Sequence, residues 1–160
     1  MFNWKFHFEH SESPGDSRLM SIFIKVKFED KQMKDILNIE GLFTSIVEDG
    51  FQPLFTCDCG NFGCGGYYVK FIHEEYGIRL INSYKPESIP SEENLMDTFE
   101  FEISWEDLYI MSSSVFDYIC DIKEKNPEYD LCTGSYGPRL VTRLEEYELI
   151  LESLRNRYDD

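Results

Sequence analysis

FEFEISWEDLYIMSSSVFDYICDI, residues 99–122, joins a strand pattern to a helix pattern without a break. In its first seven residues, large apolar side chains alternate with acidic or polar ones, which is typical of a strand with one face on a core. From Leu108 to Ile122, apolar residues recur at three- and four-residue spacing, which predicts a helix. Ser104 followed by Asp107 resembles a capping box and predicts where that helix begins. A strand that leads directly into a long helix indicates an α+β fold.

The flanking sequence adds more strands than helices. Period-two alternation or short apolar runs predict strands at residues 2–8, 22–28, 53–56, 67–73 and 78–84. Residues 31–48 change to helical spacing and predict one helix, or two if Gly41 interrupts it. Residues 85–98 are rich in Ser, Pro and Glu and predict an exposed loop.

The C-terminal region predicts a long amphipathic helix. Its apolar residues repeat at intervals of four, three, four, three and four: Leu140, Leu144, Tyr147, Leu151, Leu154 and Tyr158. This seam is expected to pack against the sheet, and the alternative is a homodimer formed through it. The chain of 160 residues is expected to be a single α+β domain, an antiparallel, meander-rich sheet with helices packed on one face.

Acidic residues dominate the charge of the chain, whose formal net charge is −16 at pH 7. Between residues 86 and 122 there are ten acidic residues and no lysine or arginine. Nucleic acids and anionic membranes carry the same sign, and proteins recognise them mainly through Lys and Arg. We therefore expect no direct binding to nucleic acid or membrane, and a basic protein as the partner.

The sequence also suggests a cellular compartment. No stretch approaches the roughly 20 apolar residues that span a bilayer, and residues 1–10 lack the apolar core of a signal peptide. Five cysteines, an odd number, argue against a complete disulfide framework. We expect a cytoplasmic protein with reduced thiols or a metal site.

The acidic side chains of the strand and of the helix define a candidate binding surface. On the strand they project opposite the phenylalanines, and on the helix they lie opposite the apolar stripe. Exposed members of a tyrosine set are expected to anchor the partner: Tyr67, Tyr68, Tyr76, Tyr84 and Tyr109. The predicted partner-binding residues are Glu100, Glu102, Glu106, Asp107, Tyr109, Asp117 and Asp121.

The leading hypothesis is an inhibitor or immunity-type protein. One continuous negative surface would imitate phosphates and block a basic surface of a nuclease or nucleic-acid-binding protein. The alternative is that these acidic residues only keep an outer face soluble.

Cysteines and glycines concentrate in CDCGNFGCGG, residues 57–66. The thiolates of Cys57, Cys59 and Cys64 are candidate zinc ligands, but a structural zinc site needs four ligands. The fourth would come from His73, Cys120 or Cys132. The favoured alternative is that these small residues pack in a sharp strand connection without any cofactor.

Residues 57–66, together with FEFEISWE at residues 99–106, resemble a loose group of uncharacterised bacterial proteins. The resemblance implies a bacterial cytoplasmic domain and no catalytic residue. In acidity and size, the chain is also similar to bacterial immunity proteins and phage-encoded inhibitors.

Two other functions stay open beside the inhibitor. One is a zinc-stabilised structural or assembly module, and the other is a small hydrolase that uses carboxylates or His73. We expect no enzymatic activity, because His7, His10 and His73 do not occur in a catalytic spacing and no lysine-containing phosphate loop is present.

Overall fold

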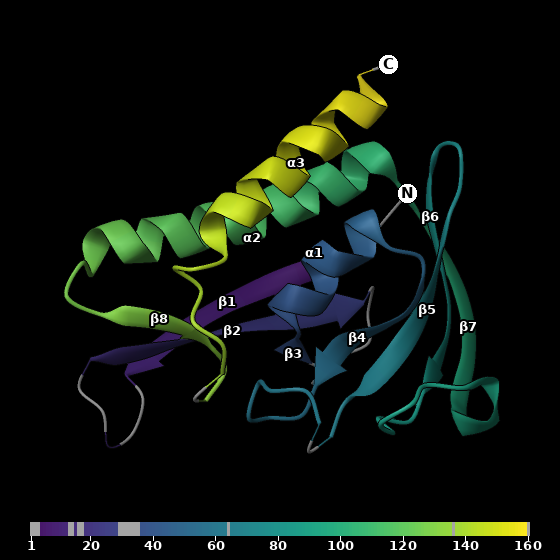
Figure 1. The fold of residues 1–160 in the computed structure, drawn as a ribbon, viewed down its shortest axis with the longest axis horizontal. Helices are drawn as coiled ribbons and strands as arrows, with labels where there is room; N and C mark the ends of the chain where they lie inside the picture. The colour runs from purple at the N-terminus through teal and green to yellow at the C-terminus, as the bar shows by residue number, and fades with distance from the viewer. Residues whose placement is uncertain are drawn as a thin grey trace.

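The computed structural model describes residues 4–12, 15, 18–28, 36–63, 65–135 and 137–159. In this part of the chain, an eight-stranded curled sheet is covered on one side by three helices (Figure 1). The predicted α+β class is confirmed. The strands are β1 (Trp4–Glu12), β2 (Leu19–Phe28), β3 (Ile36–Leu37), β4 (Gly50–Thr56), β5 (Tyr67–His73), β6 (Gly77–Tyr84), β7 (Leu95–Ser104) and β8 (Asp130–Thr133). The helices are α1 (Ile39–Val47), α2 (Trp105–Lys125) and α3 (Leu144–Tyr158), with a 3-10 turn at Glu92–Asn94.

Strands β1 to β7 follow one another in the sheet in chain order, so the sheet is a meander, as predicted. Each of these neighbouring pairs is antiparallel, whereas β8 pairs with β2 in parallel. A parallel strand must be reached by a long crossover. Helix α2 supplies much of it by running across the sheet from the end of β7 towards β8 (Figure 1). Strands β1 and β7 therefore lie at opposite ends of the strand order.

The first hairpin follows the predicted alternation. β1 pairs with β2 from Trp4 opposite Phe28 to Glu12 opposite Met20. Side chains at every second position of β2 are buried: Met20, Ile22, Ile24 and Val26. Burying each such side chain stabilises the fold by about 1.5–3 kcal/mol. Phe2, predicted in the same strand as Trp4, lies outside the described residues.

The prediction of a helix over residues 31–48 is partly wrong. Residues 29–35 lie outside the described part of the chain, and Ile36 and Leu37 form β3, between β2 and β4. Helix α1 begins only at Ile39, and Gly41 lies inside it instead of interrupting it. A Cβ atom at Gly41 would lie 2.3 Å from the backbone oxygen of Pro53. The glycine is therefore needed for close packing of α1 against β4.

The predicted loop at residues 85–98 is too long. β7 begins at Leu95, because the end of β6 provides partners for it: Ser83 pairs with Asp97 and Tyr84 with Leu95. Trp105, predicted as the last strand residue, is instead the first residue of α2. These corrections move two element boundaries and keep the order of the elements.

The C-terminal helix is shorter than predicted. α3 begins at Leu144, whereas Leu140 precedes it and donates a backbone hydrogen bond to the Leu131 carbonyl at 2.9 Å. The main neighbours of α3 are the helices α2 and α1, so its seam packs on them and not on the sheet as expected. Four residues of the predicted dimer seam are buried within the chain itself: Leu140, Tyr147, Leu151 and Leu154. Among the described helices, none has both the length and the apolarity needed to cross a bilayer.

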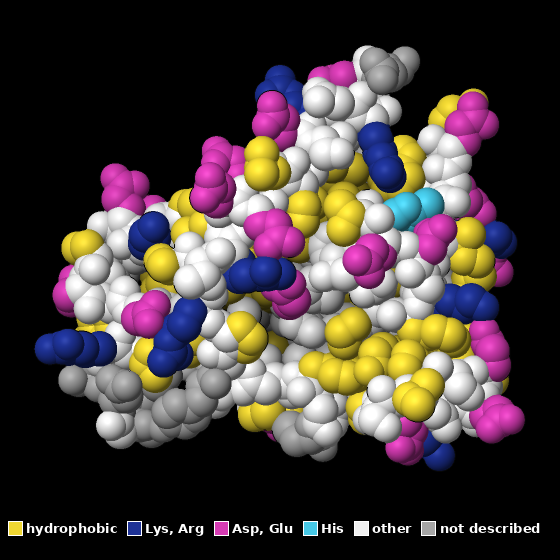
Figure 2. Space-filling model, viewed as in Figure 1, with side chains coloured by type: hydrophobic (Ala, Val, Ile, Leu, Met, Phe, Trp, Pro, Cys, Tyr) yellow, Lys and Arg dark blue, Asp and Glu magenta, His cyan; other side chains and the backbone are white. Residues whose placement is uncertain are grey.

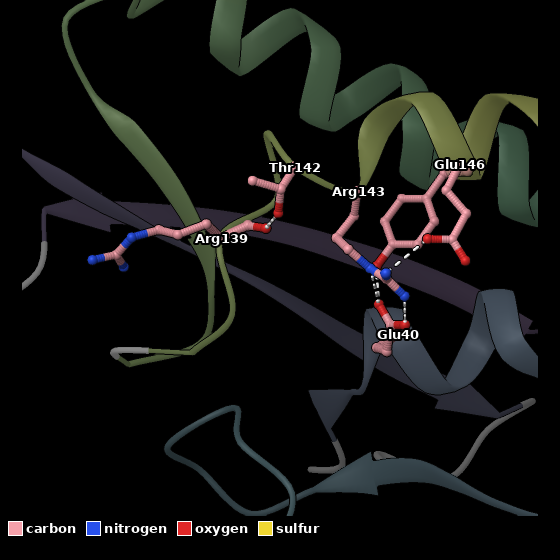
Figure 3. Close-up of polar contacts among 6 residues, drawn as sticks. Glu40, Arg139, Thr142, Arg143 and Glu146 are labelled. Atoms are coloured by element: carbon pink, nitrogen blue, oxygen red, sulfur yellow. Dashed lines mark hydrogen bonds and ion pairs between the residues drawn. The ribbon is translucent and has the colours of Figure 1, made fainter.

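A polar cluster connects the start of α3 to the start of α1 (Figure 3). The Arg143 guanidinium donates two hydrogen bonds to the Glu40 carboxylate, one of them from Nε at 3.2 Å, and pairs with Glu146 at 2.7 Å. The Tyr147 hydroxyl donates to the same Glu40 carboxylate at 2.5 Å. The Tyr147 ring stacks on Phe43, with centroids 4.0 Å apart. This cluster therefore fixes α3 to α1 through both charge and apolar contact.

Candidate protein-binding surface

The end of β7 and the start of α2 place four predicted acidic residues close together. Glu100 and Glu102 are exposed on β7, on the side opposite Phe101. Glu106 and Asp107 lie in the first turn of α2, where the positive end of the helix dipole favours carboxylates. The Ser104 hydroxyl accepts a hydrogen bond from the Asp107 backbone N–H at 3.0 Å, which confirms the predicted cap. The strand-to-helix junction therefore gathers four carboxylates, and the helix N-terminus stabilises two of them.

The turn between β5 and β6 adds carboxylates that the sequence analysis did not assign to the surface. The Trp105 indole donates a hydrogen bond to the Glu75 carbonyl at 3.1 Å, and the Trp105 backbone N–H donates to the Tyr76 carbonyl at 3.1 Å. These bonds hold the turn beside the start of α2. The pairing of Gly77 with Ser104 brings the two segments into this register. The sequence could not predict that this turn lies beside the start of α2, because the register between β6 and β7 cannot be read from it.

A cavity of about 350 Å³ lies between the turn and the β7–α2 junction. Carboxylates of Glu74, Glu75 and Glu102 belong to its lining, together with Tyr76 and Ile103. Tyr76 is 77% exposed, so its ring is available to a partner. We call Glu74, Glu75, Glu100, Glu102, Glu106 and Asp107 the acidic end of the molecule.

Two arginines in the described part of the chain lie at the acidic end: Arg157 of α3, which lines a cavity together with Glu74 and Glu75, and Arg79, which forms ion pairs. Arg79 of β6 pairs with Glu74 at 2.9 Å and with Glu100 at 3.2 Å. The hydrogen bond to Glu100 and the charge of Glu74 raise the pKa of Arg79 above its usual value. Among the described residues, the other four carboxylates of the acidic end form no ion pair: Glu75, Glu102, Glu106 and Asp107. The acidic end therefore keeps a net negative charge.

Asp117 and Asp121 do not join the acidic end. A helix rises about 1.5 Å per residue, so Asp121 lies about 21 Å along α2 from Asp107. Next to them, Tyr118 stacks on Phe8 of β1 with ring centroids 4.6 Å apart, which places this part of α2 over the sheet edge opposite β7. Asp121 also pairs with Lys125 at 2.9 Å.

The expectation of one continuous negative surface is therefore wrong. The six predicted carboxylates divide between two ends of the molecule because α2 runs across the sheet. Figure 2 shows acidic side chains spread over this face of the molecule, with Lys and Arg among them.

Tyr109 is less available to a partner than predicted. Its ring lies 5.3 Å from the Tyr158 ring of α3, and the side chain is partly buried. Tyr84 is buried, and its hydroxyl donates a hydrogen bond to Glu92 at 2.7 Å. Of the tyrosines considered, Tyr76 is the exposed one beside the acidic end.

The cysteine segment is packed against the chain that follows β8. The Cys57 and Cys59 sulfurs lie 2.9 Å apart, whereas Cys64 lies outside the described residues. The Ser135 backbone N–H donates to the Cys59 carbonyl at 2.7 Å. A Cβ atom at Gly60 would lie 2.5 Å from Gly134. This close approach explains Gly60 and Gly134 by packing.

Of the candidate fourth zinc ligands, Cys132 lies nearest the segment, since its sulfur is 3.6 Å from the carbonyl oxygen of Gly134, which packs on Gly60. Cys132 is buried beside the Ser21 hydroxyl, at 3.7 Å. Cys120 lies on α2, where burial raises the pKa of its thiol. Within the described residues, no three His, Cys, Asp or Glu side chains are arranged to hold a metal ion.

His73, the candidate catalytic residue, contacts the end of α1 and the segment that follows it. Its ring nitrogen Nε2 lies 2.7 Å from the Ser45 carbonyl, and its backbone N–H donates to Asp49 at 2.6 Å. A second cavity, of about 310 Å³, is lined by His73, Glu74, Glu75, Trp105 and Arg157. This lining contains no Ser, Thr or Cys nucleophile among the described residues.

The arrangement at the acidic end is suited to attract a cationic group. Unpaired carboxylates, an exposed tyrosine ring and a cavity meet at the acidic end. The exposed ring of Tyr76 in the same lining offers apolar surface against which a long basic side chain can pack its aliphatic stem. Comparisons of the chain with protein-family models, with curated proteins and with solved structures found no match.

Proposed function

We propose that the chain is an acidic protein-binding module that docks its acidic end on a basic protein surface. The observation that carries this proposal is the cavity lined by Glu74, Glu75 and Glu102 beside the exposed ring of Tyr76. A Lys or Arg side chain of the partner would enter the cavity and meet these carboxylates. The inhibitor or immunity-type role follows if that basic surface is the one its owner uses to bind nucleic acid.

Charge supports this function in two ways. The net charge of −16 gives a long-range field that speeds encounter with a basic partner and repels nucleic acid. Near the surface, the carboxylates that form no ion pair with described residues have capacity left for a partner's cations. Tyr76 then supplies an aromatic contact of the kind that dominates binding energy at many interfaces.

The test compares two variants with the same change in net charge. Glu75→Lys/Glu102→Lys reverses charge at the acidic end, and Asp117→Lys/Asp121→Lys reverses it near β1. Tagged protein is used to capture partners from its host at low salt, and the partners are eluted with increasing salt and identified by mass spectrometry. We expect basic proteins that the first variant loses and the second retains.

Two results would contradict the proposal. Equal loss in both variants would show that only overall charge matters, and retention at high salt would remove the electrostatic component. For a captured nuclease, addition of the wild-type chain should reduce DNA cleavage, and the Glu75→Lys/Glu102→Lys variant should not.

A further inference from the structure

β7 is an edge strand with a free side. It is the last strand in the sheet order and, among the described residues, it pairs only with β6. It extends over ten residues, from Leu95 to Ser104. An edge strand exposes backbone N–H and C=O groups that can pair with another extended chain.

The hydrogen bonds at the two ends of this stretch show which amides face outwards. The Phe99 N–H donates to the Asn82 side chain of β6 at 3.1 Å, and the Trp105 N–H donates to the Tyr76 carbonyl at 3.1 Å. The register between these points is continuous from Glu100 to Ser104. Since N–H directions alternate along a strand, the N–H groups of Glu100 and Glu102 point away from β6.

The two faces of β7 differ in chemistry. Phe99 and Phe101 face the core but are only partly buried, with ring centroids 5.3 Å apart. Glu100 and Glu102 are exposed on the opposite face. A strand added beside β7 would therefore continue an apolar row on one face and meet carboxylates on the other.

We infer that β7 binds an extended segment of the partner in which basic and apolar residues alternate. The inference rests on the proposed function and specifies how the acidic end holds its partner. Backbone hydrogen bonds from Glu100 and Glu102 fix the segment along the edge. Its basic side chains then lie beside the carboxylates, and its apolar side chains cover Phe99 and Phe101.

A β7 strand from a second copy does not fit this edge. In an antiparallel pair centred on Phe101, Glu100 of one chain would lie opposite Glu102 of the other, and like charges directly opposite one another are destabilising. The net charge of −16 on each chain adds further repulsion. The charge pattern thus disfavours a second β7 strand and favours a basic segment.

The direct test uses two synthetic ten-residue peptides of the same composition. One alternates lysine with valine, and the other places the lysines and valines in two separate blocks. Amide hydrogen exchange of the isotope-labelled chain is followed by NMR with each peptide at low salt. We expect the alternating peptide to slow exchange at Glu100 and Glu102, and the block peptide to leave it unchanged.

A pair of variants separates the backbone contribution from the charge contribution. Glu102→Gln removes the carboxylate and keeps the N–H, whereas Glu102→Pro removes both at a position where an edge strand tolerates proline. We expect Glu102→Pro to bind the alternating peptide about tenfold more weakly than Glu102→Gln, as the loss of one hydrogen bond predicts. Thermal unfolding of each variant confirms that it is folded.

The possible failures are distinguishable. If both peptides bind equally and the Glu100 and Glu102 amides exchange as before, edge pairing is overturned while docking through charge stands. If the capture experiment shows no loss in Glu75→Lys/Glu102→Lys, the proposed function itself fails. Self-association of the chain that Glu102→Pro abolishes would overturn the assignment to a foreign segment, because the first part of β1 of a second copy places Lys5 and His7 between aromatic residues.

Discussion

At the residue scale, Tyr147 is the side chain whose removal should be most informative about the helical layer. Its hydroxyl donates to the Glu40 carboxylate at 2.5 Å, and its ring is buried against Phe43. We expect Tyr147→Phe to lower the free energy of unfolding by about 1.5–3 kcal/mol, as for other hydrogen bonds to charged groups. Urea unfolding at neutral pH measures this loss, and an unchanged midpoint would show that the bond contributes nothing net.

Tyr147 should also affect how the stability of the fold changes at alkaline pH. Burial, and then the hydrogen bond to Glu40, raise the pKa of Tyr147 well above its usual value of 10.0. Above that pH the unfolded chain ionises this tyrosine while the folded chain keeps it protonated, so stability falls by about 1.4 kcal/mol per pH unit. The contribution is fully present below pH 10.0 and is lost as pH rises.

The alkaline effect is measured as a difference between two proteins. Other tyrosines with raised pKa values, such as Tyr118, contribute to the slope in both. Stability is followed by urea unfolding between about pH 9 and about pH 11. We expect a shallower decline in Tyr147→Phe than in the wild type, and equal slopes would refute the assignment to Tyr147.

Gly41 provides a test in which packing opposes helix propensity. Alanine in a helix is favoured over glycine by about 1 kcal/mol, so Gly41→Ala would stabilise α1 if propensity decided. Because the added Cβ would lie 2.3 Å from the Pro53 oxygen, we expect a loss of about 1–3 kcal/mol instead. Thr44→Ala in the same helix is the matched control, and thermal unfolding of both variants measures the difference.

At the element scale, the Ser104 cap is the feature that both sequence and structure identify. Its hydroxyl accepts the Asp107 N–H at 3.0 Å and marks the change from β7 to α2. We expect Ser104→Ala to lower the free energy of unfolding by about 1 kcal/mol. Ser104→Asp should keep most of the wild-type stability, because aspartate also caps helices. Chemical unfolding of the three proteins tests this, and equal stability of Ser104→Ala and wild type would contradict it.

Strands and helices with a strong hydrophobic period could be predicted from the sequence. Strands that form only because a neighbouring strand pairs with them could not. Alternation of apolar and polar residues predicted β1 and β2. Three- and four-residue spacing of apolar residues, together with the Ser104 cap, predicted α2. β3 has only Ile36 and Leu37, too few residues for any period, and exists because β2 and β4 lie on either side of it. The first residues of β7 are exposed and irregular in pattern, and they extend the strand because β6 pairs with them.

At the scale of the whole molecule, the sequence reveals how much charge there is but not where it gathers. Asp107 and Asp121 belong to one helix, yet that helix crosses the sheet and separates them by about 21 Å. Arg79, distant in sequence from Glu100, pairs with it because β6 and β7 are neighbours. Glu74 and Glu75 join the site through the same strand pairing. The candidate surface could therefore be predicted at the β7–α2 junction, and its remainder required the tertiary fold.

The charge of the whole molecule predicts how its stability responds to salt. A net charge of −16 repels itself in the compact state, and about 0.5 M salt shortens the screening length to roughly 4 Å. Salt also weakens ion pairs, but those such as Lys70–Glu92 and Lys125–Asp121 are exposed, and exposed pairs contribute only about 0–1 kcal/mol each. Relief of repulsion should dominate, so we expect the melting temperature to rise as the sodium chloride concentration increases.

The measurement uses sodium chloride and not a sulfate salt. Sulfate is excluded from the protein surface, which strengthens apolar burial and would raise the melting temperature whatever the charge of the protein. A melting temperature that falls with sodium chloride would mean that the ion pairs outweigh the repulsion.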